Sequence, residues 1–474
     1  MTTLVITLLA YKFLLIGIGF WASKRSSTSE DFHLAGRNLG PWVASLSSAA
    51  SSSSAWSLLG VSGSAYVWGF SAVWLIPACL FGFCLNWFFV ADRLRHLSEK
   101  SQAVTLVEIF SNDAPARLRK VIILLSAFII LSSLSIYIAS QFKAAGVTFS
   151  EILDMPTNYS VLVGGSIVIA YTMIGGFWAV SVTDFFQGII MALASILLPL
   201  AAFIEVGYWD GLVEGLRQAN DPILLDVFRG KIGFSLAGFL IGTFGIGLGY
   251  PGQPHVVNRF MAMRSSQDVA RGTWISLAWG VIIYSGMVIL GLSGRGLAPN
   301  IDNPEAILLV LSNSLFSPVV AGILIAAVLS AIMSTADSQL LVCSSVISRD
   351  CFGRESRFLD RLTIFCVGFL SISAAMLVEQ TIFDSVLFAW GALGAAFGPL
   401  LLVRLLKGPV HPVSVIFAIG SGFFIALFWH FFSSLRQFID GLVPAFIVSG
   451  LFALHGARIG IDSQRLFLKK GTDE

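Results

Sequence analysis

The chain has 474 residues, of which 56% are hydrophobic and only 12% are charged. Soluble domains carry about 25% charged residues, so the composition excludes an ordinary soluble protein. A net charge of +2 gives no basic excess of the kind that nucleic-acid partners select, and we expect none. The five cysteines show no metal-ligand spacing, and we expect neither a disulfide framework nor a transition-metal site.

Apolar runs of about 20 residues recur along the whole chain, and each is long enough to cross a bilayer. We count thirteen, over residues 3–22, 40–60, 65–91, 121–147, 159–178, 183–206, 233–252, 272–294, 317–347, 359–378, 382–405, 410–433 and 436–456. The first run lacks a basic leading segment and a clear cleavage site, so we expect a retained helix rather than a signal peptide.

The basic residues between these runs predict the orientation. With the N-terminus outside, 22 lysines and arginines fall in cytoplasmic segments and 6 in outside segments, as the positive-inside rule requires. This count places Arg259 in a cytoplasmic loop and leaves Lys12 as the one basic residue inside a span. We expect a multi-pass protein of the cell (inner) membrane with its C-terminus in the cytoplasm.

Two of the predicted helices are interrupted. Four consecutive serines lie in Pro41–Gly60, PWVASLSSAASSSSAWSLLG, and a glycine and proline cluster ends Gly233–Pro254, GFSLAGFLIGTFGIGLGYPGQP. Unpaired backbone groups cost several kcal/mol in hydrocarbon, so a broken helix is tolerated only where protein or a cavity surrounds it. Small residues that merely let helices pack closely are the simpler alternative, but a continuous helix would not choose this cluster. Paired broken helices indicate the midplane binding site of a secondary transporter.

The two breaks open blocks of similar length, each with five predicted helices. Because five is odd, the second block enters the membrane from the opposite side, and the fold expected is all-α, with two inverted repeats whose first helix is discontinuous. The expected organisation of this single transport domain is a leading helix and loop (1–39), repeat one (40–206), an external connection with a short helix (207–232), repeat two (233–405), and two trailing helices with a cytoplasmic tail (406–474).

Two carboxylates inside predicted spans are functional candidates, because charge within a membrane is expensive. Asp337 is surrounded by hydroxyls at helical spacing: Ser330, Ser334 and Ser338 recur every four residues, and Ala331, Ser334 and Thr335 share one face. Hydroxyls, carboxylates and carbonyls freed near Ala50 and Ser53 are the oxygen ligands that a hard cation prefers.

Simpler interpretations remain open for these polar residues. The hydroxyls of Ser334 and Thr335 can bond back to the previous turn of their own helix. Asp337 can pair with a base, for which only Lys12 is in a span. Asp184 lies either in a binding site or near the cytoplasmic interface, where water would solvate it.

Three aromatic residues lie at or opposite the breaks. Trp56 and Tyr250 adjoin them, and Tyr137 lies in the symmetry mate of the helix that carries Asp337. Such rings can enclose a small apolar body while the positive end of a half-helix favours a carboxylate. We interpret the histidines His255, His411 and His455 as loop or interface residues.

Several long stretches resemble the sodium/solute symporter family, and most closely its bacterial proline-transporting members. They lie between about residues 30 and 410 and read AGRNLGPWVASLS, LNWFFVADRLR, IGGFWAVSVTDFFQG, GLGYPGQPHVVNRFMA and AAVLSAIMSTADSQLLVCSS. Several long motifs in the right order are far more specific than any short pattern. The family couples sodium entry to solute uptake on two inverted five-helix repeats.

The resemblance also implies site residues. Sodium would bind the backbones of Ala50, Ser53 and Ala331 and the hydroxyls of Ser334 and Thr335. A second sodium, present in some relatives, would use Asp184, Asp337 and Ser338 together with Ser334. The solute-contacting positions are Trp56, Tyr137, Tyr250 and Pro254. Arg37 matches an arginine linked to transport.

Two positions depart from the proline-transporting pattern. Ser52 stands where those relatives have an aspartate that supports sodium binding, and Ile246 stands where they have a pocket tryptophan. We expect a sodium-coupled symporter for proline or a similar amino acid, with sodium as the coupling ion and no obligate protein partner. The alternatives are uptake of another small carboxylate or organic solute, or a non-transporting sensor. An enzyme or a channel fits less well, since no nucleophile arrangement and no continuous polar pore is apparent.

Overall fold

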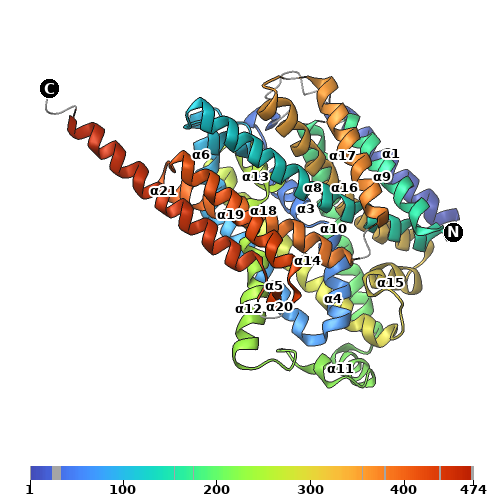
Figure 1. The fold of residues 1–474 in the computed structure, drawn as a ribbon. Coiled ribbons are helices and arrows are strands. Elements are labelled where there is room, and N and C mark those ends of the chain that lie inside the picture. The colour runs from blue at the N-terminus through green and yellow to red at the C-terminus, as the bar shows by residue number, and fades with distance from the viewer. Residues whose placement is uncertain are drawn as a thin grey trace.

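The computed structural model describes residues 2–23, 34–153, 155–174, 176–354, 356–377, 380–436 and 439–470. The described elements are helices apart from one isolated bridge between Leu39 and Met263. They form a bundle in which α3, α10 and α16 lie near the middle and α21 extends away from the body (Figure 1). The chain is therefore all-helical, as predicted.

The helices have the following bounds. They are α1 (Thr2–Ser23), α3 (Pro41–Ser52), α4 (Val61–Trp68), α5 (Leu75–Cys84), α6 (Ala91–Ser101), α7 (Leu106–Ser111), α8 (Ala116–Leu153), α9 (Thr157–Ile174), α10 (Phe177–Glu205), α11 (Tyr208–Gln218), α12 (Gly233–Leu248), α13 (Pro254–Met261), α14 (Ser266–Leu297), α15 (Ile307–Leu315), α16 (Pro318–Ser345), α17 (Arg357–Leu377), α18 (Ile382–Lys407), α19 (Pro412–Phe431), α20 (Ser433–Arg436) and α21 (Leu442–Lys470).

Within the described residues, ten helical segments are long and apolar enough to cross a membrane. Ten of the thirteen predicted runs correspond to these segments, and the other three fall on α1, α3 and α9. The run predicted over 40–60 is split, because α3 stops after 12 residues and helix resumes at Trp56. The short helix expected between the two blocks is α11.

The first break follows Ser52. Ser53 leaves helical geometry with φ −109° and ψ 79°, and a π-helical turn, η2 (Trp56–Gly60), restarts the helix before α4. A restarted helix exposes amides without helical partners. Side chains satisfy two of them here: Ala55 N donates to Gln141 Oε1 at 3.0 Å, and Trp56 N donates to Ser54 Oγ at 3.2 Å. Buried side chains thus supply hydrogen bonds that the broken helix lacks.

The second break follows Leu248 and includes the turn η6 (Tyr250–Gly252). Pro254 opens α13 at a position where its missing N–H costs nothing. Gly252 packs directly on α18, since a Cβ there would lie 2.6 Å from Gly394 Cα and from the Leu393 carbonyl oxygen. Gln253 Nε2 donates to the carbonyl of Trp390 at 2.9 Å, so α18 holds this break in place.

The helix α16 forms the centre of the bundle. Every residue from Leu324 to Ser345 is buried, although this stretch carries Asp337 and seven hydroxyl or amide side chains. A lipid-facing helix would expose one apolar stripe, whereas α16 contacts α1, α3, α8, α10 and α17. Its polar residues therefore face other helices rather than lipid.

Candidate sodium and solute site

The broken end of α3 meets the hydroxyls of α16. Ser334 Oγ donates to the Ala50 carbonyl at 3.2 Å, and Thr335 Oγ1 donates to the Ser51 carbonyl at 3.1 Å. The last carbonyls of a helix have no partner within it, which is why this end of α3 accepts bonds from a neighbour. All four residues are buried.

These oxygens form a set that suits a hard monovalent cation. Ala331 belongs to it as well, because its carbonyl accepts from Ser334 Oγ at 3.3 Å. The donors are neutral carbonyl and hydroxyl oxygens with free lone pairs. Both hydroxyl protons now point at carbonyls, so an ion between them would require each O–H to rotate away.

Ser53 is placed differently from its predicted partners. Its amide donates to Ala49 and its hydroxyl lies 3.3 Å from the Tyr284 hydroxyl of α14. Ser51, which the sequence did not single out, contacts α16 instead. Besides its carbonyl, its hydroxyl lies 3.0 Å from Ser338 Oγ. The two-residue offset depends on where the helix stops, which a serine run does not specify.

A buried ion pair lies one turn away. Asp184 Oδ2 on α10 accepts from Arg259 Nη2 of α13 at 3.1 Å, from Ser47 Oγ at 2.8 Å and from Ser51 Oγ at 3.2 Å. Arg259 also donates to Ser338 Oγ at 2.5 Å. The side chains of Asp184 and Arg259 are 0% and 1% exposed. One pair therefore joins α3, α10, α13 and α16.

This pair corrects two interpretations made from the sequence and decides between the two that were left open for Asp184. Arg259 is not a cytoplasmic loop residue, Asp184 is not solvated near an interface, and Lys12, whose side chain lies outside the described ones, is not the only interior base. The reason is that helix resumes after the second break and turns Arg259 inward. His255, four residues earlier on the same face, is also buried rather than in a loop, and its ring meets Tyr137 edge-on at 6.0 Å.

Asp337 is buried in the same region. Its Oδ1 accepts from Ser338 Oγ at 3.3 Å, while Oδ2 has no hydrogen-bond partner in the described part of the chain. An unpaired buried carboxylate oxygen is rare and requires an explanation such as an ion. Ser338 links this carboxylate to the Arg259 guanidinium and to Ser51.

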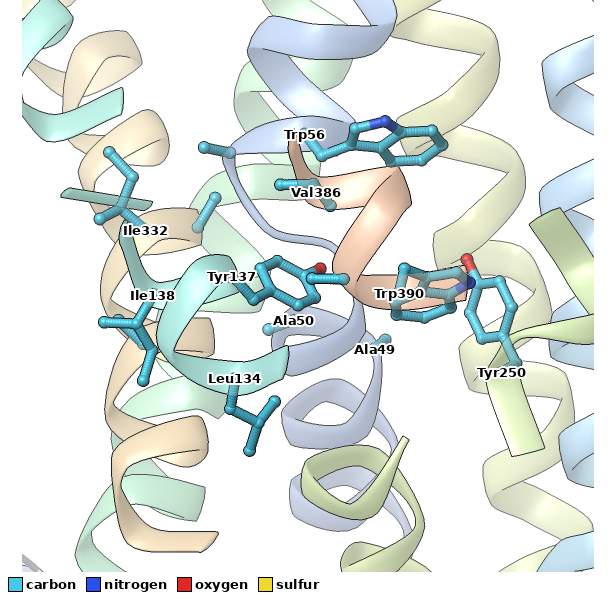
Figure 2. Packing of buried hydrophobic residues seen from close by; sticks show 14 of the residues in the cluster. Ala49, Ala50, Trp56, Leu134, Tyr137, Ile138, Tyr250, Ile332, Val386 and Trp390 are labelled. Atoms are coloured by element: carbon cyan, nitrogen blue, oxygen red, sulfur yellow. The ribbon is translucent and has the colours of Figure 1, made fainter. Parts of the chain in front are cut away.

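The predicted aromatic residues lie around the two breaks (Figure 2). The Tyr137 hydroxyl on α8 donates to Ser54 Oγ at 3.3 Å, within the first break. Tyr250 meets Trp390 of α18 edge-on at 4.7 Å between ring centroids, and Trp390 is 6.5 Å from Tyr137. Pro254 is buried at the start of α13. Tyr137, Tyr250 and Trp390 thus line one region, which Figure 2 shows beside Ala50.

Trp56 lies at the restart of the first broken helix. Its ring stacks on Phe383 of α18 at 5.3 Å and meets Tyr284 edge-on at 6.3 Å. Its Nε1 is buried without a hydrogen-bond partner among the described residues. The sequence did not single out Tyr284, Phe383 or Trp390, because apolar aromatics in ordinary spans carry no local signal of their position.

Arg37 links the segment before α3 to the end of α13. Its guanidinium donates to Ser98 Oγ at 2.6 Å, to the Ala103 carbonyl at 2.9 Å and to the Met261 carbonyl at 3.3 Å. Met261 ends α13, so these bonds tie the segment before α3 to the end of the second broken helix. The bridge between Leu39 and Met263 reinforces the same contact.

Comparison with known proteins identifies the family of this chain. The model of the sodium:solute symporter family matches residues 32–407. The chain belongs to this family. It is accordingly a sodium-coupled solute symporter and not an enzyme.

Curated relatives match nearly the whole chain. The high-affinity proline transporter PutP of Bacillus subtilis is 35% identical, with 91% of this chain and 93% of the relative covered. The sodium/proline symporter of Staphylococcus aureus is 32% identical, with 97% and 95% covered.

Solved structures show the same fold at low identity. The sodium-coupled sialic acid symporter, in a substrate-bound outward-open state, matches with a TM-score of 0.79 at 17% identity over 96% of this chain and 98% of that one. Mhp1, a nucleobase-cation-symport-1 family transporter, matches with a TM-score of 0.59 at 11% identity over 90% and 95%.

Ser52 and Ile246, the two residues that depart from the proline-transporting pattern, make specific contacts in the structure. The Ser52 hydroxyl bonds back to the Ala49 carbonyl at 2.9 Å and so stays within its own helix. The Ile246 carbonyl accepts from Trp390 Nε1 at 3.0 Å, and Ile246 lines a cavity between α12 and α18. Ser52 thus makes a bond within α3, and the tryptophan that meets Tyr250 edge-on is Trp390.

The buried pair gives a stability prediction. Asp184→Asn or Arg259→Gln alone leaves an uncompensated buried charge, which costs about 3–5 kcal/mol of unfolding free energy. The double variant removes both charges and loses less than the sum of the two single losses. Unfolding of the purified protein in detergent measures this.

Arg217→Gln, which removes the partner of Glu214 in an ion pair exposed on both sides, is the control and produces only a small change. Strictly additive losses for Asp184→Asn and Arg259→Gln would contradict the pairing.

Proposed function

We propose that this chain is a cell-membrane symporter that couples sodium entry to the uptake of proline or a similar amino acid. The observation that carries this is the contact between the carbonyls at the broken end of α3 and the hydroxyls of Ser334 and Thr335. Two relatives named as proline transporters, each matching over nine tenths of both chains, support the choice of solute.

The proposed topology has thirteen spans, with the N-terminus outside and the C-terminus in the cytoplasm. Repeats 40–206 and 233–405 enter the membrane from opposite sides. The support is that each begins with a discontinuous helix, α3 with α4 and α12 with α13, and that the two breaks share α18 as a neighbour. Alternating access would rock one block of helices against the other around the breaks.

The proposed sodium ligands are Ala50, Ser53, Ala331, Ser334 and Thr335. Sodium would take the place of the two hydroxyl-to-carbonyl bonds and so fix α3 against α16. The residues proposed for a second sodium are Asp184, Asp337 and Ser338. Because the Arg259 guanidinium already contacts Asp184 and Ser338, a second ion would have to compete with it for these oxygens.

The proposed solute contacts are Trp56, Tyr137, Tyr250 and Pro254, and we add Trp390 because its ring meets those of Tyr250 and Tyr137. The rings would enclose the apolar body of the solute. Its carboxylate would lie near the N-terminal end of the helix that restarts at Trp56, where the partial positive charge of a helix favours an anion. Sodium and solute would then bind to adjacent faces of the same broken segment.

Coupling follows from this adjacency. If sodium and solute both stabilise one arrangement of the first break, each raises the affinity for the other by the same factor. The proposed role of Arg37 is to hold the cytoplasmic ends of α3 and α13 together until both have bound.

A second candidate is the sodium-coupled uptake of a different small carboxylate or other organic solute. The observation that favours it is Ile246, whose aliphatic side chain leaves a differently shaped wall where proline-transporting relatives are expected to have tryptophan. A non-transporting sensor on the same fold would bind solute without accumulating it.

Sodium-gradient-driven uptake in proteoliposomes tests these proposals. Purified protein is screened with proline, other amino acids and small monocarboxylates, with choline replacing sodium as the control. We expect saturable, sodium-dependent accumulation of proline against its gradient. Accumulation of another solute alone would favour the second candidate, and binding without accumulation would favour the sensor.

Thr335→Ala removes one proposed sodium ligand. A polar contact to a charged group contributes about 1.5–3 kcal/mol, so the half-saturating sodium concentration rises roughly tenfold or more. Ser344→Ala is the matched control, because that buried hydroxyl on α16 bonds within its own helix, to Leu341. Equal sodium dependence in the two variants would show that Thr335 does not bind the ion.

Trp56→Ala removes a ring from the proposed solute site. Aromatic contacts contribute about 0.5–1.5 kcal/mol beyond burial, so the KM for solute rises by up to about tenfold, while the half-saturating sodium concentration changes less. Trp42→Ala, on the exposed start of α3, is the control and leaves both unchanged. Parallel changes in the two constants would indicate that Trp56 only packs.

A further inference from the structure

A second cavity lies beyond the proposed solute site, on the side where α12 begins, which the proposed topology places outside. Its volume is about 330 Å³, within the range of small-molecule sites. Its lining includes Trp68, Arg229, Lys231, Ile246, Phe383 and Asp440. Its charged residues lie outside the proposed sodium and solute sites.

Phe383 contacts both this cavity and the proposed solute site. Phe383 lines the cavity and stacks on Trp56 with 5.3 Å between centroids, and it also meets Trp68 edge-on at 5.3 Å. Ile246 reaches the cavity from α12, four residues before Tyr250. A solute that enters from this side therefore contacts the cavity before it contacts Trp56.

The positively charged side chain of Arg229 lies at the wall of this cavity. Arg229 has φ +57°, a left-handed conformation that is strained for a residue with a Cβ. Asp226 fixes the turn around it: Oδ1 accepts from Phe228 N at 2.8 Å and Oδ2 from Gly230 N at 2.7 Å. Trp74 Nε1 anchors the same loop by donating to the Val227 carbonyl at 3.1 Å.

This turn places the Arg229 guanidinium over the Trp68 ring, with Cζ 5.2 Å from the ring centroid. Such stacking leaves the edge of the guanidinium, with its N–H donors, available to a carboxylate. Partial burial lowers the pKa of Arg229 from its ordinary value, but an arginine stays charged at neutral pH. The strained loop thus presents a fixed positive charge to the cavity.

The remaining lining defines the chemistry of the ligand. Lys231 adds a second positive charge, while Trp68, Phe383 and Leu387 supply apolar walls. Asp440 supplies a carboxylate, and its Oδ1 also accepts from Leu442 N at 2.9 Å. Two bases, one acid and apolar walls are complementary to a small amino-acid zwitterion.

We propose that this outer cavity is a first binding site for the solute, in which Arg229 binds the solute carboxylate before the solute passes Phe383 to reach Trp56. The proposal rests on the proposed function, because it assumes an amino-acid-like solute that enters from this side. The alternative is a purely structural role, in which Arg229 only anchors its loop on Trp68. The experiment must distinguish this role from solute binding.

The test compares Arg229→Gln, Arg229→Lys and the unaltered protein in proteoliposomes. Arg217→Gln is the matched control, because that exposed arginine on α11 carries the same charge outside the cavity. Initial rates of L-proline uptake are measured under an inward sodium gradient, and the ionic strength is varied with choline chloride at constant sodium. Salt screens the attraction between a carboxylate and a charge in an open cavity.

We expect Arg229→Gln to raise the KM at least fivefold, to leave Vmax within twofold, and to flatten the dependence of KM on ionic strength. Arg229→Lys keeps the charge and gives an intermediate KM, and Arg217→Gln behaves like the unaltered protein. An unchanged KM in Arg229→Gln, or a loss of Vmax alone, would overturn the proposal. Absence of sodium-driven proline uptake by the unaltered protein would instead contradict the proposed function, and with it this inference.

Discussion

The carbonyl oxygens at the broken end of α3 need partners that lipid cannot supply. In this chain Ser334 and Thr335 of α16 provide them, and this contact fixes the position of the first break between two buried helices. The same carbonyls and hydroxyls carry the lone pairs that a sodium ion requires. The groups that satisfy the broken backbone are thus the same groups that we propose as sodium ligands.

Specific contacts hold the helices together at both ends of this break. Arg37 ties the start of α3 to the end of α13, and the Asp184–Arg259 pair joins α13 to α10. On the opposite side Phe383 covers Trp56, and Glu305 holds the start of α18, since its carboxylate accepts the amides of Ile382 and Phe383 at 2.9 and 2.8 Å. Opening either end therefore means breaking a small number of specific bonds.

The sequence predicted those features that depart from the pattern of an ordinary apolar helix. Serines in a span indicated a break within Pro41–Gly60, the glycine and proline cluster indicated the turn before α13, and the hydroxyl spacing near Asp337 indicated the polar side chains of α16 that meet α3. The sequence did not predict the position of side chains that depends on packing between distant helices. Arg259 looked like a loop charge because nothing in GYPGQPHVVNRF shows that helix resumes and turns inward. Trp390, Tyr284 and Phe383 lie in ordinary apolar spans, so only the fold shows that they surround the breaks.

The most direct measurement is a pair of high-resolution maps of the purified protein, one in sodium and one in choline. The account predicts density for an ion between the Ala50 carbonyl and the Thr335 hydroxyl in sodium only, with both α16 hydroxyls turned away from the carbonyls of α3. Hydroxyl-to-carbonyl bonds that stay unchanged in both salts, with no ion at the end of α3, would contradict it.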